Sequence, residues 1–156
     1  MGLAYALLLL FATPPVAGAS SSAAPTVENL VAGAEACATR KLSDTKMAER
    51  LATLGWQARE KLRPGKSMQM STYVRMDVTI YYFTSPEMTQ CIARGGMPAN
   101  FDQAALVSAL AAKLAKAPKT AEAGRRYLYF LPRLDILTLQ FKSDDKDPHI
   151  EMSVVH

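Results

Sequence analysis

The segment from Met68 to Phe83 alternates strictly between two sets of side chains, and it is the strongest structural signal in the chain. Successive side chains of a β-strand point to opposite faces, so a period of two predicts a strand. One set is mostly apolar and consists of Met68, Met70, Thr72, Val74, Met76, Val78, Ile80 and Tyr82. The other set consists of Gln69, Ser71, Tyr73, Arg75, Asp77, Thr79, Tyr81 and Phe83. We therefore predict one long, half-buried strand whose methionines point into the core.

Helical spacing of apolar residues predicts three helices around this strand. The first is expected to be capped by Thr26, the second to begin with Asp44 as its N-cap and end at Gly55, and the third to open with a capping box from Asn100 to Gln103. Shorter strands are predicted at 56–62, 89–94, 127–131, 134–141 and 149–155, and 120–124 is expected to be a linker. Trp56 is expected to be a core anchor.

The order of these elements is helix, helix, three strands, helix, three strands, a weak internal repeat without residue-level similarity between its halves. It predicts a single α+β domain over residues 26–156. We expect an antiparallel sheet of about five to six strands, with the helices packed on one face.

The first nineteen residues have the pattern of a signal peptide. An apolar run from Leu3 to Ala12 is followed by Pro14 and Pro15 and then by small residues that a signal peptidase could cleave before Ser20, although no basic residue precedes the run. We predict a signal peptide over residues 1–19, a disordered leader over 20–25, a periplasmic or secreted location, and no transmembrane anchor after cleavage. A retained anchor is the alternative, but the proline pair would break a membrane-spanning helix too early.

Two cysteines, Cys37 and Cys91, are the only ones in the chain. In an oxidising compartment an even number of cysteines favours a disulfide, which here would close a long loop. Two buried free thiols are the alternative.

Basic and aromatic residues provide the candidate binding surface. The chain has 18 Lys and Arg against 14 Asp and Glu, a net charge of +4, which favours encounter with anionic partners. If the strands alternate as expected, Arg59, Lys61 and Arg63 lie on one face, beside Tyr73, Arg75 and Tyr81 on the outer face of the long strand. Such a surface suits a partner protein or an anionic envelope component, and the modest charge of an exported chain argues against nucleic acid as a partner.

Catalytic and metal-binding patterns are weak. His149, Glu151 and Ser153 would lie side by side on the last strand rather than form a hydrogen-bonded triad, because residues two apart on a strand are separated by about 6.6 Å. With His156 as the only other histidine, we expect no zinc site and no other metal site or cofactor. Met68, Met70 and Met76 could bind Cu(I), but the core interpretation is favoured.

The sequence thus favours an exported, noncatalytic binding protein that acts through a sheet face, such as an inhibitor, an immunity-type protein or an envelope accessory protein. An enzyme of unrecognised type and a soft-metal carrier of copper are the alternatives.

Overall fold

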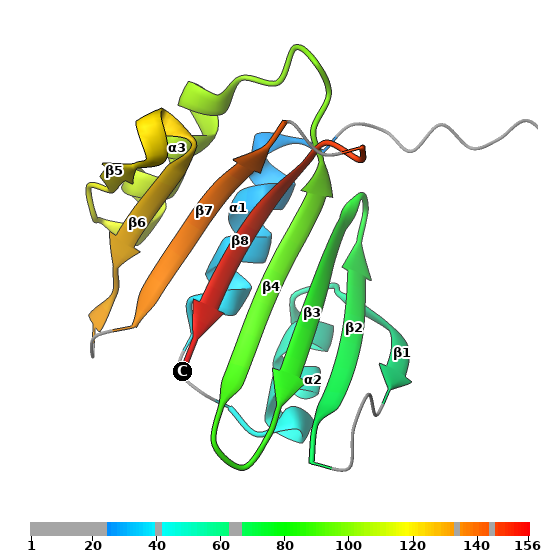
Figure 1. Ribbon diagram of the computed structural model, residues 1–156. Coiled ribbons are helices and arrows are strands. Elements are labelled where there is room, and N and C mark those ends of the chain that lie inside the picture. Colours follow the sequence, from blue (N-terminus) through cyan, green and yellow to red (C-terminus); the bar gives the residue numbers. More distant parts are fainter. Residues whose placement is uncertain (1–24, 40–41, 63–66, 133–134, 144–145) are drawn as a thin grey trace, which may run out of the picture.

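The computed structural model describes residues 25–39, 42–62, 67–132, 135–143 and 146–156. An antiparallel sheet of eight strands has the order β1-β2-β3-β4-β8-β7-β6-β5, and the helices lie behind one of its faces, as Figure 1 shows. We call the covered side the helix face and the other side the open face. The predicted α+β class and one-sided helix layer are confirmed, whereas the expected count of five to six strands was too low.

Each half of the chain is a helical segment followed by four strands. The helices are α1 (Val27–Cys37), α2 (Asp44–Thr53) and α3 (Gln103–Leu114), and a short 3-10 helix, η1, covers Glu122–Gly124. The strands are β1 (Gln57–Leu62), β2 (Gln69–Arg75), β3 (Val78–Thr84), β4 (Thr89–Gly96), β5 (Lys119–Ala121), β6 (Arg126–Phe130), β7 (Ile136–Lys142) and β8 (His149–Val155). The last strand of each half, β4 or β8, lies at the centre of the sheet, where the two pair with each other.

The predicted long strand is in fact a hairpin. Met76 and Asp77 form a two-residue turn between β2 and β3, and Met76 adopts the left-handed conformation with φ of 55°. Arg75 pairs with Val78 across the turn. Because residues paired across two strands share a face, odd positions of β2 lie on the same side as even positions of β3.

Because of this change of parity, the side chains of β2 point to the faces opposite to those predicted. In β3 the buried side chains are Val78, Ile80 and Tyr82, as predicted, but in β2 they are Ser71 and Tyr73. Met70 lies on the open face and Met76 is 79% exposed at the turn, so the prediction that the methionines point inward was wrong.

The core fills the space between the helix face and the three helices. Trp56 is 4% exposed and is a core residue, as expected. Gly33 of α1 lets the helix approach the sheet closely, since a Cβ there would lie 3.0 Å from the Cβ of Ala93 on β4. Gly95 on the same strand has the same role, because its Cβ would lie 2.9 Å from Leu30 and 3.2 Å from Pro25.

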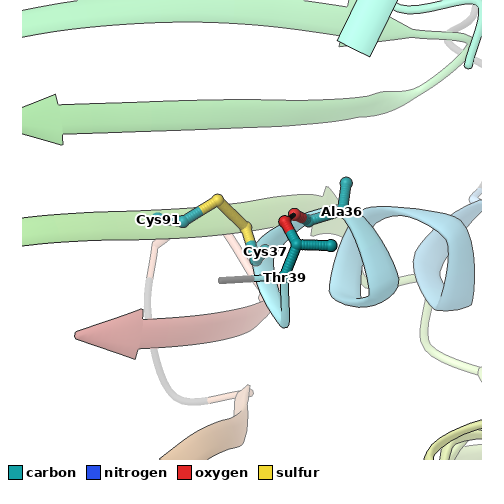
Figure 2. Close-up of a disulfide and its surroundings, with 4 residues drawn as sticks. All are labelled: Ala36, Cys37, Thr39 and Cys91. Carbon is teal, nitrogen blue, oxygen red and sulfur yellow. Dashed lines mark hydrogen bonds between the residues drawn. A yellow bond between two sulfur atoms is a disulfide. The ribbon is translucent and has the colours of Figure 1, made fainter. Parts of the chain in front are cut away.

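A disulfide joins the end of α1 to the middle of the sheet. Figure 2 shows the Cys37–Cys91 bond beside the last turn of α1, where the hydroxyl of Thr39 donates to the carbonyl of Ala36 at 2.7 Å. Both cysteines are fully buried and their Cα atoms are 5.3 Å apart. The predicted disulfide is confirmed.

Helix ends depart from the prediction by one or two residues. Thr26 caps α1 as expected, but Ser43 rather than Asp44 caps α2, and Asp102 rather than Asn100 caps α3. The side chains of Ser, Asp and Asn all serve as N-caps, so neighbouring candidates compete. The expected linker at 120–124 instead forms β5 and η1.

The predicted signal peptide lies outside the described residues. Of the predicted leader only Pro25 is described, and it is buried against Gly95 rather than disordered. Among the described helices, none has the length and apolar character needed to cross a membrane.

Candidate functional site

Two neighbouring hollows lie along β1 and β2, and both are lined by Arg59. The larger has a volume of about 430 Å³ and is lined by Asn29, Gly55, Gln57, Arg59, Val74, Arg75 and Met76. The smaller has a volume of about 280 Å³ and is lined by Asp44, Ala48, Ala58, Arg59, Glu60, Lys61, Ser71, Thr72 and Tyr73. Four of the six predicted binding residues therefore line these hollows.

The larger hollow is lined by two arginines, and none of its described lining residues carries a carboxylate. Arg59 is exposed and Arg75 is half-buried, and neither forms an ion pair with a carboxylate in the described part of the chain. Asp77, in the turn between β2 and β3, accepts a hydrogen bond from the Asn29 amide at 3.2 Å. The hollow is thus basic, and amide groups from Asn29 and Gln57 complete its polar lining.

The smaller hollow is centred on Asp44, the first residue of α2. Its Oδ2 accepts hydrogen bonds from Lys61 Nζ and from Gln69 Nε2, both at 2.7 Å, and its Oδ1 accepts one from Ser71 Oγ at 2.8 Å. Burial raises the pKa of Asp44, but the hydrogen bonds from these three donors and the charge of Lys61 outweigh burial and hold the pKa below its ordinary value. Lys61 is therefore paired, whereas no ion pair of Arg59 or Arg75 is found among the described residues.

The expected single binding face was wrong, because the structure distributes the predicted residues over two faces. A β-bulge between Ala58 and Glu60 shifts the register at Arg59, so the alternation that was to align Arg59 with Lys61 is interrupted. Arg63 lies outside the described residues.

The two tyrosines of the predicted surface are also separated. Tyr73 is 4% exposed beneath the helix layer, where burial and the charge of Asp44 raise the pKa of its phenol. Tyr81 lies on the open face, opposite Thr72 and Ile92. Their binding role stays a prediction, but they cannot act on one surface.

The methionines proposed for copper are also apart. Met76 is at the β2–β3 turn, whereas Met70 lies near the other end of β2, about 20 Å away along an extended strand. The described residues contain no group of three or more His, Cys, Asp or Glu side chains placed to hold a metal ion.

His149 has a structural setting on the open face. It is 7% exposed, its Nδ1 lies 2.8 Å from the carbonyl oxygen of Asp147 and 3.2 Å from Arg94 Nη2, and Arg94 also donates to the Asp147 carboxylate at 2.8 Å. Its Nε2 lies 3.9 Å from the carboxylate of Glu151. His149 lies on the open face with Glu151 and Ser153, side by side along β8 as predicted, and these contacts bury its ring.

Sequence reasoning missed Asp44, Asn29 and Gln57 as members of the site. Asp44 was interpreted as a helix cap, a role in which its carboxylate also accepts hydrogen bonds. Nothing in the spacing of Asn29 and Gln57 connects these two residues with β2. Comparison of the chain with protein-family models, curated proteins and solved structures finds no match.

Proposed function

We propose that this protein is an exported, noncatalytic binding protein whose larger basic hollow, between Arg59 and Arg75, holds an anionic group of its partner. The observation that carries this proposal is the presence of Arg59 and Arg75 in one hollow whose described lining residues include no carboxylate. Guanidinium groups form two parallel hydrogen bonds with carboxylate or phosphate oxygens, so two of them suit an oxyanion.

The size and lining of the hollow support a small or terminal group rather than a long polymer groove. Its volume of about 430 Å³ lies within the range of small-molecule sites. Val74 and Met76 supply apolar contact beside the two cations, which suits an anionic head attached to an apolar body. An envelope component bearing phosphate or carboxylate has this chemistry.

Export is supported by the N-terminal pattern, and the Cys37–Cys91 disulfide is compatible with it. Fractionation of cells expressing the full chain tests this part. Recovery of a mature protein beginning at Ser20 outside the cytoplasm is expected, and an uncleaved cytoplasmic protein would contradict export.

Binding is tested with vesicles of phosphatidylglycerol, vesicles of phosphatidylcholine, and inorganic phosphate. We expect retention on the anionic vesicles, or a measurable phosphate affinity, that Arg59→Gln and Arg75→Gln each weaken at least about tenfold, as for the loss of a charge-assisted hydrogen bond. Lys116→Gln is the matched control, because it removes one positive charge from an exposed site beyond α3. Equal losses of affinity in all three variants would show that only net charge matters and would contradict specific binding in the hollow.

A further inference from the structure

The open face of the sheet carries an apolar row at the strand ends farthest from the Met76–Asp77 turn. The row, named after its β4 residue Gln90, consists in order from β1 to β6 of Leu62, Met70, Phe83, Gln90, Val155, Ile136 and Phe130. Six large hydrophobic side chains are exposed in the described chain, and four of them, 38–50% exposed, belong to this row. Concentrated exposure of this kind marks an interaction surface.

Two further rows follow along the strands. The Ile92 row, in order from β1 to β5, is Glu60, Thr72, Tyr81, Ile92, Ser153, Thr138, Leu128 and Lys119. The Arg94 row, in the same order, is Gln57, Val74, Thr79, Arg94, Glu151, Gln140, Arg126 and Ala121. In Figure 1 no described helix stands in front of these strands.

The strand order is symmetric about the boundary between β4 and β8. A twofold axis parallel to the strands at this boundary would place the open faces of two copies against each other. Each β4 would then lie over β8 of the second copy, each β3 over β7, each β2 over β6 and each β1 over β5. The rows would stay aligned, because the axis runs along the strands.

Charges on the two faces match in this arrangement. Arg94 of each copy would face Glu151 of the other, since both belong to the Arg94 row on the two central strands. At the edges, Glu60 on β1 would face Lys119 on β5. Arg126, whose guanidinium already pairs with Glu122 at 2.7 Å, would face an apolar residue of β2, and no like charges meet within these rows.

The apolar row matches as well. Met70 would face Phe130 of the second copy, and Phe83 would face Ile136. Six central strands at about 4.8 Å and three rows at about 6.8 Å span roughly 600 Å² of projected face. A stable interface buries about 800 Å² of accessible surface per partner. A face of this projected area is sufficient, because protruding side chains give it an accessible surface larger than its projected area.

We propose that a second copy of this chain docks on the open face, about a twofold axis parallel to the strands, to form an aligned pair of sheets. Aligned sheets pack about 10 Å apart with their inner side chains interdigitated, which is the geometry that would bury the Gln90 row. The hollows share Gln57, Glu60, Thr72 and Val74 with the edge of this face, but the dimer is argued from the rows alone and does not depend on the proposed function.

Charge reversal with complementation tests both the interface and its axis. Sedimentation equilibrium of the purified, oxidised protein at micromolar concentration is expected to give a dimer. Arg94→Glu places two acidic residues at the centre of the face, and Glu151→Arg places two basic ones, so each variant alone is expected to associate at least about tenfold more weakly. An equimolar mixture is expected to restore a dimer containing one chain of each kind, measured by native mass spectrometry.

The mixture separates this interface from the contacts that Arg94 makes with Asp147 and His149 within one chain, since a second chain cannot restore those contacts. Lys113→Glu is the matched control, because it breaks the ion pair with Glu35 at 3.2 Å on the helix side and should leave the dimer unchanged. If either central variant fails to fold, Val155→Lys, at a site already 50% exposed, must weaken the dimer instead. A monomeric wild-type protein, or a mixture that stays monomeric, would overturn the proposal.

Discussion

The disulfide is expected to supply a large share of the stability of this domain. Cys37 and Cys91 are 54 residues apart, and in the chain-entropy model a loop of this length contributes about 4 kcal/mol to the free energy of unfolding. A domain of this size has a total stability of about 5–15 kcal/mol. With a shift of about 3–5 °C per kcal/mol, loss of the bond should lower Tm by roughly 12–20 °C.

The assay must reduce the bond in the unfolded protein, because both cysteines are fully buried and a reductant cannot reach them in the native state. The protein is unfolded in guanidinium chloride with a phosphine reductant, refolded, and melted under circular dichroism beside an oxidised sample. Exposure of the native protein to the reductant should not break the bond before unfolding begins. A native sample treated in this way and freed of the reductant before the melt should therefore have the Tm of the oxidised protein.

A double variant, Cys37→Ala with Cys91→Ala, is the control. Its Tm should be low and insensitive to the reductant. A Tm difference of less than about 5 °C between the oxidised and the reduced wild-type protein would refute the entropic argument, because a contribution of 4 kcal/mol cannot produce so small a shift.

Three further substitutions test local features by urea denaturation. Gly95→Ala should cost about 1–3 kcal/mol, because its Cβ would approach a side chain of α1 at 2.9 Å, whereas Gly96→Ala, with open space around its Cβ, should be neutral. Equal effects of the two substitutions on stability would contradict the explanation that α1 approaches Gly95 closely. Asp44→Ala should cost about 1–3 kcal/mol at neutral pH, since three donors lose their acceptor, while Glu49→Ala on the same helix should cost little. The pKa of Asp44 is lower in the folded than in the unfolded state, so its contribution to the free energy of unfolding is present above about pH 4 and is lost as the pH falls through the folded pKa. The Asp44→Ala variant should therefore lose less stability in acid than the wild-type protein. A parallel decline of both proteins with pH would contradict this role. Met76→Asn should raise stability by about 0.5–1 kcal/mol, because the residue has φ of 55° and is 79% exposed, and an unchanged urea midpoint would argue against strain at the turn.

The elements with strong local signals were predictable. Strand β8 has the bounds that alternation and the preceding loop predicted, and Thr26 caps α1 as its side chain chemistry requires. The left-handed residue Gly55, with φ of 81°, ends the α2 segment as expected. Each of these positions depends on residues close in the chain, which is the range over which sequence patterns carry information.

The elements that were missed lack such signals. The turn at Met76 has neither glycine nor asparagine at its left-handed position, so the strand pattern runs through it without interruption. Strand β5 has only three residues, and pairing with β6 rather than its own composition makes it a strand. The bulge at Arg59 likewise exists only in the register with β2.

These local misses explain why the predicted binding surface was wrong as a unit. A two-residue turn reverses the parity between β2 and β3, so Tyr73 is buried under the helices while Tyr81 stays on the open face. The same reversal places Met70 beside Phe83 on the open face, where it extends the apolar Gln90 row across the first half of the sheet. A continuous strand would have buried Met70 and left the row without its β2 member. The turn at Met76 therefore decides both which aromatic residues are available to a partner and how far the apolar face reaches, so a change of turn length would disrupt the Gln90 row and the proposed dimer together.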